Sequence, residues 1–417
     1  MTSWLKDPAA RRDVRVIGVV GFAHGTSHFF HLLLPPLFPW LMHDFGLTFT
    51  EVGALMSIFF VISGIGQASA GFAVDRIGPR RVLMFGVAML SIAGFTLSLA
   101  THYWALALTA AFAGLGNSVF HPADFTILNR RVSPQRLGYA FSVHGLTGNL
   151  GWAAAPIFMA GITALAGWHW AGFGAGLLAT FVLAVLVWQR DLLDVHETGT
   201  HAAHVAANPK TTNTFAFLQS SAVWLCFSFF FVTTLALGVL QSFSPTLLNR
   251  IYGLSLAAAT SGLTAYLLGG AIGIVAGGFL AGRGGQHDRV ITWALSLSAL
   301  CALVIALNVV PAWSVVALMA TLGLGVGVAG PSRDLLVRQA ATAGFGKAAF
   351  GRVYGFVYSG LDLGFAIAPL IFGPLMDRGY FSTVLFAVAA LQGLAILSAL
   401  SVGLHSRYTR RVAAGAS

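Results

Sequence analysis

The amino-acid sequence predicts an all-α polytopic membrane protein with twelve transmembrane helices. Of its 417 residues, 57% are hydrophobic and 9% are charged, whereas about a quarter of the residues in soluble domains are charged. Apolar runs of about 20 residues, the length that crosses the hydrocarbon core as a helix, follow one another along the chain. Segments of the first half also recur in the second, which indicates two related six-helix halves.

Polar loops between the apolar runs place each span to within a few residues. In the first half we expect helices at residues 16–41, 52–74, 82–100, 104–127, 139–165 and 168–187. In the second half we expect them at residues 222–247, 256–280, 290–309, 312–337, 353–376 and 383–404. Cys226 and Cys301 both fall inside such runs, so we predict neither a disulfide framework nor a thiolate metal site.

One long polar stretch separates the two halves. Residues 189–214 are too polar to bury and lack the apolar periodicity of a packed helix. We therefore expect a first six-helix half at residues 1–188, a cytoplasmic linker at 189–214 and a second six-helix half at 215–417. The linker histidines His196, His201 and His204 could bind metal, but we favour a solvated tether.

Basic residues set the expected orientation, because Lys and Arg gather in cytoplasmic loops. With a cytoplasmic N-terminus, all of the 23 Lys and Arg except Arg250 and Arg378 lie on the cytoplasmic side. An even number of helices returns the C-terminus to that side, so we expect a multi-pass protein of the inner (cytoplasmic) membrane with both termini cytoplasmic. The net charge of +10 is spread over short loops, which argues against a nucleic-acid partner.

Two repeated segments show how the halves are related. The sequence AGFAVDR at residues 70–76 recurs as GGFLAGR at residues 277–283, 207 positions later. Four residues of the fifth helix recur in the eleventh at an offset of 213: Leu150, Gly151, Ala155 and Pro156 match Leu363, Gly364, Ala368 and Pro369. Both copies fall on helices of the same parity and so have the same topology. This predicts a parallel repeat, with the halves related by an axis along the membrane normal.

The segment GFAVDRIGPRRVL at residues 71–83 resembles the loop signature between the second and third helices of the major facilitator superfamily. In that family the motif latches one conformation and does not contact substrate. The resemblance carries this role to Gly71, Asp75, Arg76, Gly78 and Arg81. From the residues themselves, Gly71 allows helices to approach closely. Pro79 departs from the signature and Gly282 replaces the aspartate in the second copy, so we expect a latch in the first half only.

Residues 114–156 resemble the fosmidomycin-resistance branch of that superfamily. The branch carries a Phe-His-Pro followed by a Gly-Asn-x-Gly…Pro pattern. These motifs stand here as Phe120, His121 and Pro122, and then as Gly148, Asn149, Gly151 and Pro156. The superfamily resemblance extends over nearly the whole chain. It implies the twelve-helix fold and secondary transport, and the branch implies drug efflux by antiport.

Polar residues inside spans are costly and point to function. Asp362 lies near the middle of its span, as the counterpart of Asn149 at an offset of 213. We interpret Asp362 as a proton carrier; the alternative is a protonated side chain that only bonds a neighbouring helix. His144 and Tyr358 add polar groups on helices that could border the cavity, although packing between helices is the favoured role of the tyrosines.

A gate is expected near the cytoplasmic ends of the fourth and tenth helices, where Asp124 and Asp334 occupy matching places. At a shallow depth their carboxylates would pair with arginines, Arg333 among them, in structural or gating contacts. Pro122 breaks the helix ladder beside His121. His121 then either relays protons or caps the broken helix.

His24, His28 and His31 recur at intervals of four and three residues, so a helix places them on one face. Such a stripe could bind a metal ion, exchange protons, or bind an anionic substrate when charged. The structural alternative is that neutral imidazole rings form hydrogen bonds between helices, and we favour this role for His31. We assign no metal ligands, because no second cluster of ligands faces the stripe from a known cavity helix.

These observations predict a secondary transporter that works by alternating access, most simply a proton-coupled antiporter exporting a small organic compound. A proton-linked importer of an organic acid or metal chelate, or a divalent-metal transporter using the first-helix histidines, remain alternatives. The sequence holds no G-x-x-x-x-G-K-[ST] loop, and we expect no enzymatic activity and no cofactor. The expected partners are a small-molecule substrate, protons and the lipid bilayer, with the monomer as functional unit.

Overall fold

The computed structural model describes residues 7–194, 216–282, 287–345 and 350–415, and within these ranges the chain is helical and contains no strand. The first half holds α1 (Pro8–His31), η2 (Pro35–Leu37), α2 (Phe38–Phe45), α3 (Phe49–Ile77), α4 (Pro79–Ser98), α5 (Tyr103–Asn117), α6 (Phe120–Arg131), η3 (Pro134–Arg136), α7 (Leu137–Ala166), α8 (Trp168–Trp188) and α9 (Arg190–Leu193). The second half holds η4 (Ala216–Gln219), α10 (Ser221–Tyr252), α11 (Leu256–Gly282), α12 (His287–Leu307), η5 (Ala312–Ser314), α13 (Val315–Phe345), α14 (Phe350–Asp377) and α15 (Phe381–Gly415).

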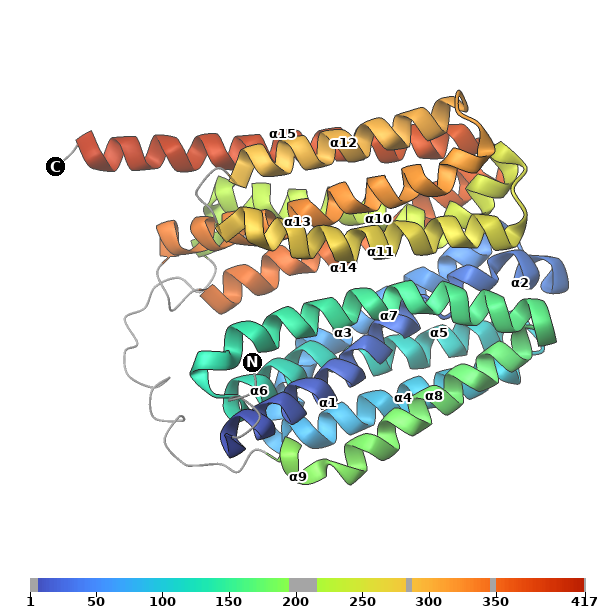
Figure 1. The fold of residues 1–417 in the computed structure, drawn as a ribbon, viewed down its shortest axis with the longest axis horizontal. Coiled ribbons are helices and arrows are strands. Elements are labelled where there is room, and N and C mark those ends of the chain that lie inside the picture. Colours follow the sequence, from blue (N-terminus) through green and yellow to red (C-terminus); the bar gives the residue numbers. More distant parts are fainter. Residues whose placement is uncertain (1–6, 195–215, 283–286, 346–349, 416–417) are drawn as a thin grey trace.

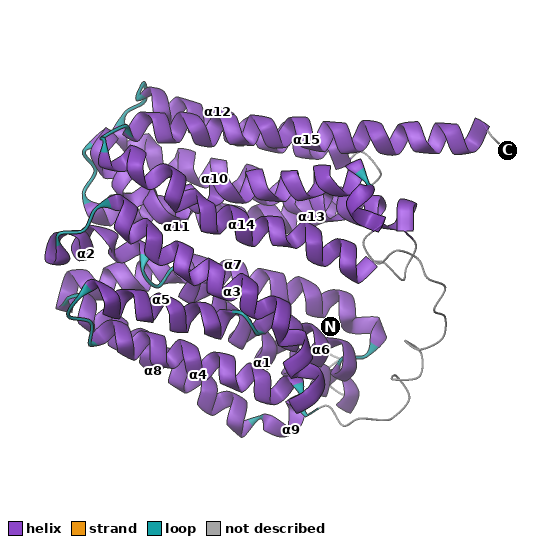
Figure 2. Cartoon of the chain, turned by 180° about the vertical axis from the view of Figure 1, so that it is seen from behind, coloured by secondary structure: helices purple, strands orange, loops and turns teal. Residues whose placement is uncertain are grey.

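The helices form two bundles that lie side by side, α1 to α9 in one and α10 to α15 in the other (Figure 1). Among the described residues, 12 segments are long and apolar enough to cross a membrane, which confirms the predicted number. The beginning of α1, the end of α15 and α9 lie at one end of the molecule, here called the linker end, and α2 lies at the opposite or far end (Figure 2). The exact boundaries of the linker stay a prediction, because residues 195–215 lie outside the described ranges.

Two predicted spans are interrupted. The expected first helix at residues 16–41 ends at His31, and a short 3₁₀ turn at Pro35–Leu37 precedes α2. Consecutive prolines lack the amide donors that would continue the helix. The expected fourth helix at residues 104–127 divides into α5 and α6 at Ser118 and Val119. Pro122 cannot donate to the carbonyl four residues earlier, so the break falls before this proline, which occupies the first turn of α6.

Glycines bring α1 directly against α7. A Cβ atom on Gly25 would lie 2.9 Å from the backbone oxygen of Thr147, and a Cβ on Gly151 would overlap the backbone oxygen of Gly25. Small residues at such positions let the backbones of two helices come into direct contact. This contact presses the histidine face of α1 against α7.

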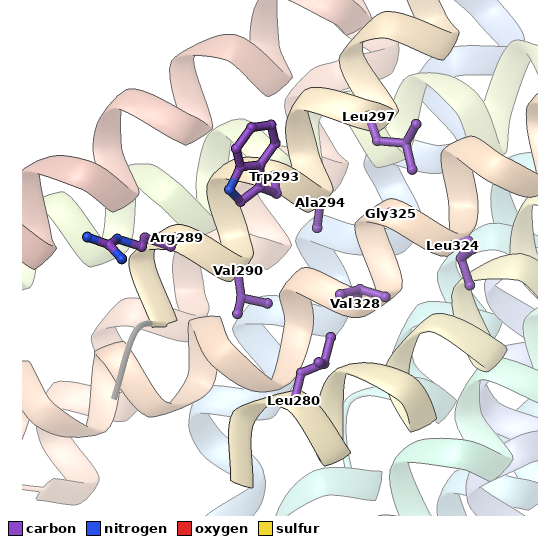
Figure 3. Close-up of a pocket in the computed structure, with 9 residues that line it drawn as sticks. All are labelled: Leu280, Arg289, Val290, Trp293, Ala294, Leu297, Leu324, Gly325 and Val328. Atoms are coloured by element: carbon purple, nitrogen blue, oxygen red, sulfur yellow. The ribbon is translucent and has the colours of Figure 1, made fainter. Parts of the chain in front are cut away.

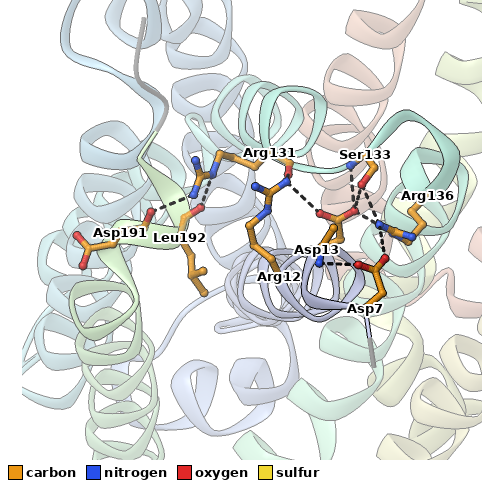
Figure 4. A network of polar contacts seen from close by, with 9 residues as sticks. Asp7, Arg12, Asp13, Arg131, Ser133, Arg136, Asp191 and Leu192 are labelled. Atoms are coloured by element: carbon orange, nitrogen blue, oxygen red, sulfur yellow. Dashed lines mark hydrogen bonds and ion pairs between the residues drawn. The ribbon is translucent and has the colours of Figure 1, made fainter. Parts of the chain in front are cut away.

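A polar network fixes the linker end of the first bundle (Figure 4). The Asp13 carboxylate is 0% exposed; it accepts hydrogen bonds from the Ser133 amide at 3.0 Å, from the Ser133 hydroxyl, and from Arg136 Nε at 2.9 Å. Arg131 donates to the backbone oxygens of Asp191 and Leu192. The network ties α1 to the loop that leads from α6 to α7, and α6 to α9, so the helices that carry the site below are held in register.

The two bundles contact each other mainly through α3 with α14 and α7 with α11. A Cβ on Gly53 would lie 2.9 Å from Pro369 Cβ, and Ser57 Oγ donates to the Ala366 carbonyl at 2.7 Å. The rings of Phe60 and Phe365 stack with centroids 4.5 Å apart. These contacts occupy the far part of the α3–α14 interface.

Candidate functional site

A buried carboxylate lies at the centre of the first bundle, where α1, α6 and α7 meet. Asp124 of α6 is 0% exposed. Its Oδ2 lies 3.2 Å from His24 Nδ1 of α1 and accepts a hydrogen bond from His144 Nε2 of α7 at 3.1 Å. The predicted pairing of Asp124 with arginines is therefore wrong: its partners are two histidines, and no arginine among the described residues pairs with it.

Two further histidines adjoin this group. The His24 and His144 rings stack with centroids 3.5 Å apart, and the His28 ring follows at 4.5 Å from His24. The ring centroid of His121 lies 5.4 Å from that of His24, and His121 Nδ1 donates to Gln67 Oε1 of α3 at 2.9 Å. We call His24, His28, His121, Asp124 and His144 the His–Asp cluster.

His31 belongs to a separate group of hydrogen-bonded side chains, in which its Nε2 atom is paired. Its Nε2 donates to Asn117 Oδ1 at 2.8 Å, and Ser27 Oγ donates to the same oxygen. Asn117 Nδ2 donates in turn to Ser63 Oγ at 2.7 Å. This arrangement supports the expected helix-to-helix bonding of a neutral His31.

The His–Asp cluster itself has unmet bonding capacity. Within the described chain, Asp124 Oδ1, His24 Nδ1 and His28 Nδ1 are buried and have no hydrogen-bond partner of acceptable geometry. Gly148 of α7 forms one wall, because a Cβ there would lie 2.8 Å from the His28 ring and 3.1 Å from His24 Nε2. Buried polar atoms are normally paired, so these unpaired atoms mark a place where a proton, ion or ligand can be held.

Aromatic rings separate the cluster from the far end. The ring centroid of Trp152 lies 4.5 Å from that of His28 and 6.3 Å from that of Phe365 in the second bundle. Phe60 approaches His31 and stacks on Phe365. The side chains of Phe60, Trp152 and Phe365 thus join the two bundles beside the cluster.

Asp362 and Asn149 lie apart from the contacts of the cluster. Asp362 is half-buried on α14 and faces Gly64 of α3, where an added Cβ would lie 4.0 Å from Asp362 Oδ2. In the part of the chain that the structure describes, Asp362 has neither a hydrogen bond nor an ion pair. Asn149 donates to the Gly145 carbonyl of its own helix at 3.0 Å. Asp362 therefore sits on the surface where the two bundles meet.

The latch segment lies at the linker end. Gly78 caps α3 with φ at 86°, and Arg76 and Arg81 are exposed. No heavy atom of the described residues lies within 4 Å of the place where a Gly71 Cβ would stand, so these residues do not make the close approach expected there. The neighbouring Arg80 pairs with Asp194 at 2.8 Å.

Three predicted site residues have side chains outside the described residues: Asp75, Asp334 and Tyr358. Arg333 is described, and its guanidinium carbon lies 4.4 Å from the ring centre of Phe230. This contact between α13 and α10 keeps Arg333 within the second bundle.

Sequence reasoning missed Gln67 and Trp152, which contact the His–Asp cluster, and Asn117, which bonds the neighbouring His31. Each is a polar or amphipathic side chain inside a predicted span, which is the one signal that could have marked it. It also missed Asp377, whose carboxylate accepts hydrogen bonds from the Phe49 and Thr50 amides across the bundles.

A separate groove of 580 Å³ lies in the second bundle (Figure 3). Its walls come from α11, α12 and α13 and are mostly apolar, with Arg289 and Trp293 toward one end. No residue of the His–Asp cluster lines it. The groove is therefore not the polar site described above.

Two six-helix bundles that meet around intramembrane polar groups are the arrangement of many secondary transporters. The chain belongs to the Major Facilitator Superfamily, whose family model matches residues 19–369. It is a multi-pass membrane protein and a secondary transporter of small molecules, not an enzyme. The family expected from the sequence is thereby confirmed.

Curated relatives include transporters with different names. The chain is 27% identical over 292 residues to the fosmidomycin resistance protein of Escherichia coli, covering 68% of each chain. It is 28% identical over 394 residues to the uncharacterized MFS-type transporter YfnC of Bacillus subtilis, covering 92% of each. It is 25% identical over 292 residues to the gallate transporter of Pseudomonas putida, covering 63% of this chain and 64% of that one.

Solved structures support the fold. A bacterial homolog of the human lysosomal transporter Spinster, in an inward-facing and unoccupied conformation, superposes with a TM-score of 0.74 at 14% identity, over 96% of this chain and 98% of that one. The nucleoside transporter NupG superposes with a TM-score of 0.73 at 14% identity, over 93% and 99%. At this identity the likeness describes the arrangement of helices.

Proposed function

We propose that this transporter exports a small organic compound in exchange for protons, by alternating access in the inner membrane with both termini in the cytoplasm. The observation that carries the proposal is the position of Asp362. A carboxyl group that is half-buried between the two bundles, opposite Gly64, is costly to keep charged when the interface is closed and easily hydrated when it opens. Such a group takes up a proton in one state and releases it in the other.

The first bundle supplies the polar surface for the substrate. His24, His28 and His144 present ring nitrogens from two helices, and Trp152 adds flat apolar surface beside His28. Polar groups that converge within an apolar pocket are typical of small-molecule sites. Rocking of one bundle against the other would open this surface to alternate sides.

Export of an antibiotic-like compound is supported by the name of the Escherichia coli relative, and fosmidomycin is therefore the first compound to test. Everted membrane vesicles with an acidic interior should accumulate labelled fosmidomycin, because inward transport in these vesicles corresponds to export from the cell. Vesicles that lack the protein provide the baseline. Accumulation that is independent of the pH gradient would contradict the coupling, and accumulation only in right-side-out vesicles would reverse the direction.

Import of an organic acid is the second candidate, since one relative carries the name of a gallate transporter. The same vesicles in both orientations, tested with labelled gallate, separate the two functions. Gallate uptake driven by protons in right-side-out vesicles would favour import.

A further inference from the structure

The His–Asp cluster has the side chains of a transition-metal site. Asp124 Oδ2 lies 3.2 Å from His24 Nδ1 and 3.1 Å from His144 Nε2, and all three residues are buried. Zinc bonds to nitrogen and oxygen are about 2.0–2.2 Å long in tetrahedral sites, which puts neighbouring ligand atoms about 3.3 Å apart. The distances from Asp124 Oδ2 to the two histidine nitrogens therefore already match those between neighbouring ligands of such a site.

A second set of ligands shares His24. The ligand atoms of His24, His28 and His121 all lie within 4.8 Å of one another, as do those of His24, Asp124 and His144. The sequence argument against a metal site, that no second cluster faces the first-helix histidines, therefore does not hold. Together the two sets bring four imidazoles and one carboxylate from α1, α6 and α7, and they share His24.

The unpaired atoms of the cluster point to a cation. Asp124 Oδ1 and His28 Nδ1 are buried without a hydrogen-bond partner among the described residues, and His24 Nδ1 has only its 3.2 Å ion-pair contact with Asp124 Oδ2. A carboxylate in this position is costly unless a positive charge or a proton accompanies it. No arginine or lysine of the described chain pairs with Asp124, so the carboxyl group is accompanied by its own proton, by a charged histidine or by a bound ion.

We propose that the His–Asp cluster binds one divalent transition-metal ion of the zinc, cobalt or nickel type, with His24, Asp124 and His144 as ligands. Imidazole with carboxylate suits these ions, whereas magnesium and calcium require oxygen ligands. A small turn of the stacked rings of His24 and His144 would direct both nitrogens at the ion. The missing side chain at Gly148 leaves space beside His24 and His28 for this movement.

The experiment measures binding at equilibrium, without any gradient, on the purified full-length protein in lipid nanodiscs titrated with Co²⁺. The linker residues His196, His201 and His204 are replaced by asparagine throughout, so that they add no signal. We expect one Co²⁺ per chain, with the intense ligand-field absorption of four-coordinate cobalt, and its displacement by Zn²⁺. His24→Ala and His144→Ala should each abolish this spectrum, whereas His169→Ala, an exposed histidine of α8, should keep it.

A variant that removes no ligand tests the pocket independently of folding defects. Gly148→Ala places a methyl group 2.8 Å from the His28 ring and should weaken Co²⁺ binding about tenfold or more, the scale seen when the surroundings of ligands are disturbed. Gly161→Ala, on the same helix with no atom within 4 Å, should not. Absence of the cobalt spectrum, or its persistence in both histidine variants, would overturn the inference. Proton-coupled transport at Asp362 would be untouched by that result.

Discussion

Asp377 at the end of α14 caps the first turn of α3 in the other bundle, where its carboxylate accepts from both the amide and the hydroxyl of Thr50. The Phe49 amide donates to the other oxygen at 2.6 Å. The first amides of a helix lack partners within the helix and favour a negative charge. This residue therefore holds the two bundles together at the far end.

Asp377→Asn should loosen the far end, because one acceptor and the charge are lost. Asp377 is exposed, so we expect a shift of only about 1 kcal/mol, or about fivefold, toward the state that is open at this end. Maleimide labelling of Ser57→Cys, buried in the same interface, reports that opening after Cys226 and Cys301 are replaced by alanine.

Thr48→Ala is the matched control. Thr48 caps the same helix through a reciprocal contact with Glu51, within one bundle. This substitution should lower stability by about 0.5–2 kcal/mol without faster labelling. Equal labelling of Ser57→Cys in both backgrounds would show that Asp377 does not hold the bundles together.

Gly151→Ala should separate α1 from α7. The added methyl group would overlap the Gly25 carbonyl, and a backbone atom cannot turn aside. The apparent Tm should fall by several degrees, since overpacking costs about 1–3 kcal/mol. Gly161→Ala on the same helix meets nothing within 4 Å and should be neutral or slightly stabilising. A Tm equal to that of the parent in Gly151→Ala would contradict the close contact.

Asp13→Asn should destabilise the linker end. The Asp13 carboxylate is 0% exposed and accepts hydrogen bonds from Ser133 and Arg136, so its replacement should cost about 2–3 kcal/mol in the free energy of unfolding. Asp7→Asn serves as comparison, because Asp7 is half-exposed and lies 3.8 Å from Arg136. That change should cost less than about 1 kcal/mol. Thermal unfolding in detergent measures both, and similar losses would argue against a special role of Asp13.

Asn117→Ala should lower stability while leaving the His–Asp cluster able to bind Co²⁺. The substitution removes the partners of His31 Nε2, Ser27 and Ser63, and each unsatisfied buried group costs about 1–3 kcal/mol. Parallel Tm and Co²⁺ measurements on the variant check this separation. Loss of Co²⁺ binding with an unchanged Tm would place Asn117 in the metal site.

The architecture follows from the sequence because apolar length and internal repeats directly reflect the bilayer and the duplication. The twelve spans and the family are confirmed. The interruption after His31 escaped prediction, because the apolar run continues through it. A broken helix was expected beside Pro122, but the position of the break directly after Asn117 was not. Only the prolines nearby signalled them, and a proline does not say on which side of it the helix ends.

The sequence predicted only part of the candidate site. His24 and His28 share a face because of their spacing in one helix, a local property. Asp124 and His144 meet them across about 100 residues of chain, through the glycine contacts of α1 with α7. Spacing carries no information on such a meeting, so Asp124 was expected near the cytoplasmic end of its helix with arginine partners, and its histidine partners were missed.

The most direct test of the central claim, that protons drive transport through Asp362, compares the parent protein with Asp362→Asn in proteoliposomes. Asparagine keeps the size of the side chain and cannot exchange a proton. With labelled fosmidomycin, we predict that the variant loses accumulation driven by a pH gradient but retains exchange of labelled for unlabelled compound. Accumulation in the variant equal to that of the parent would contradict the claim.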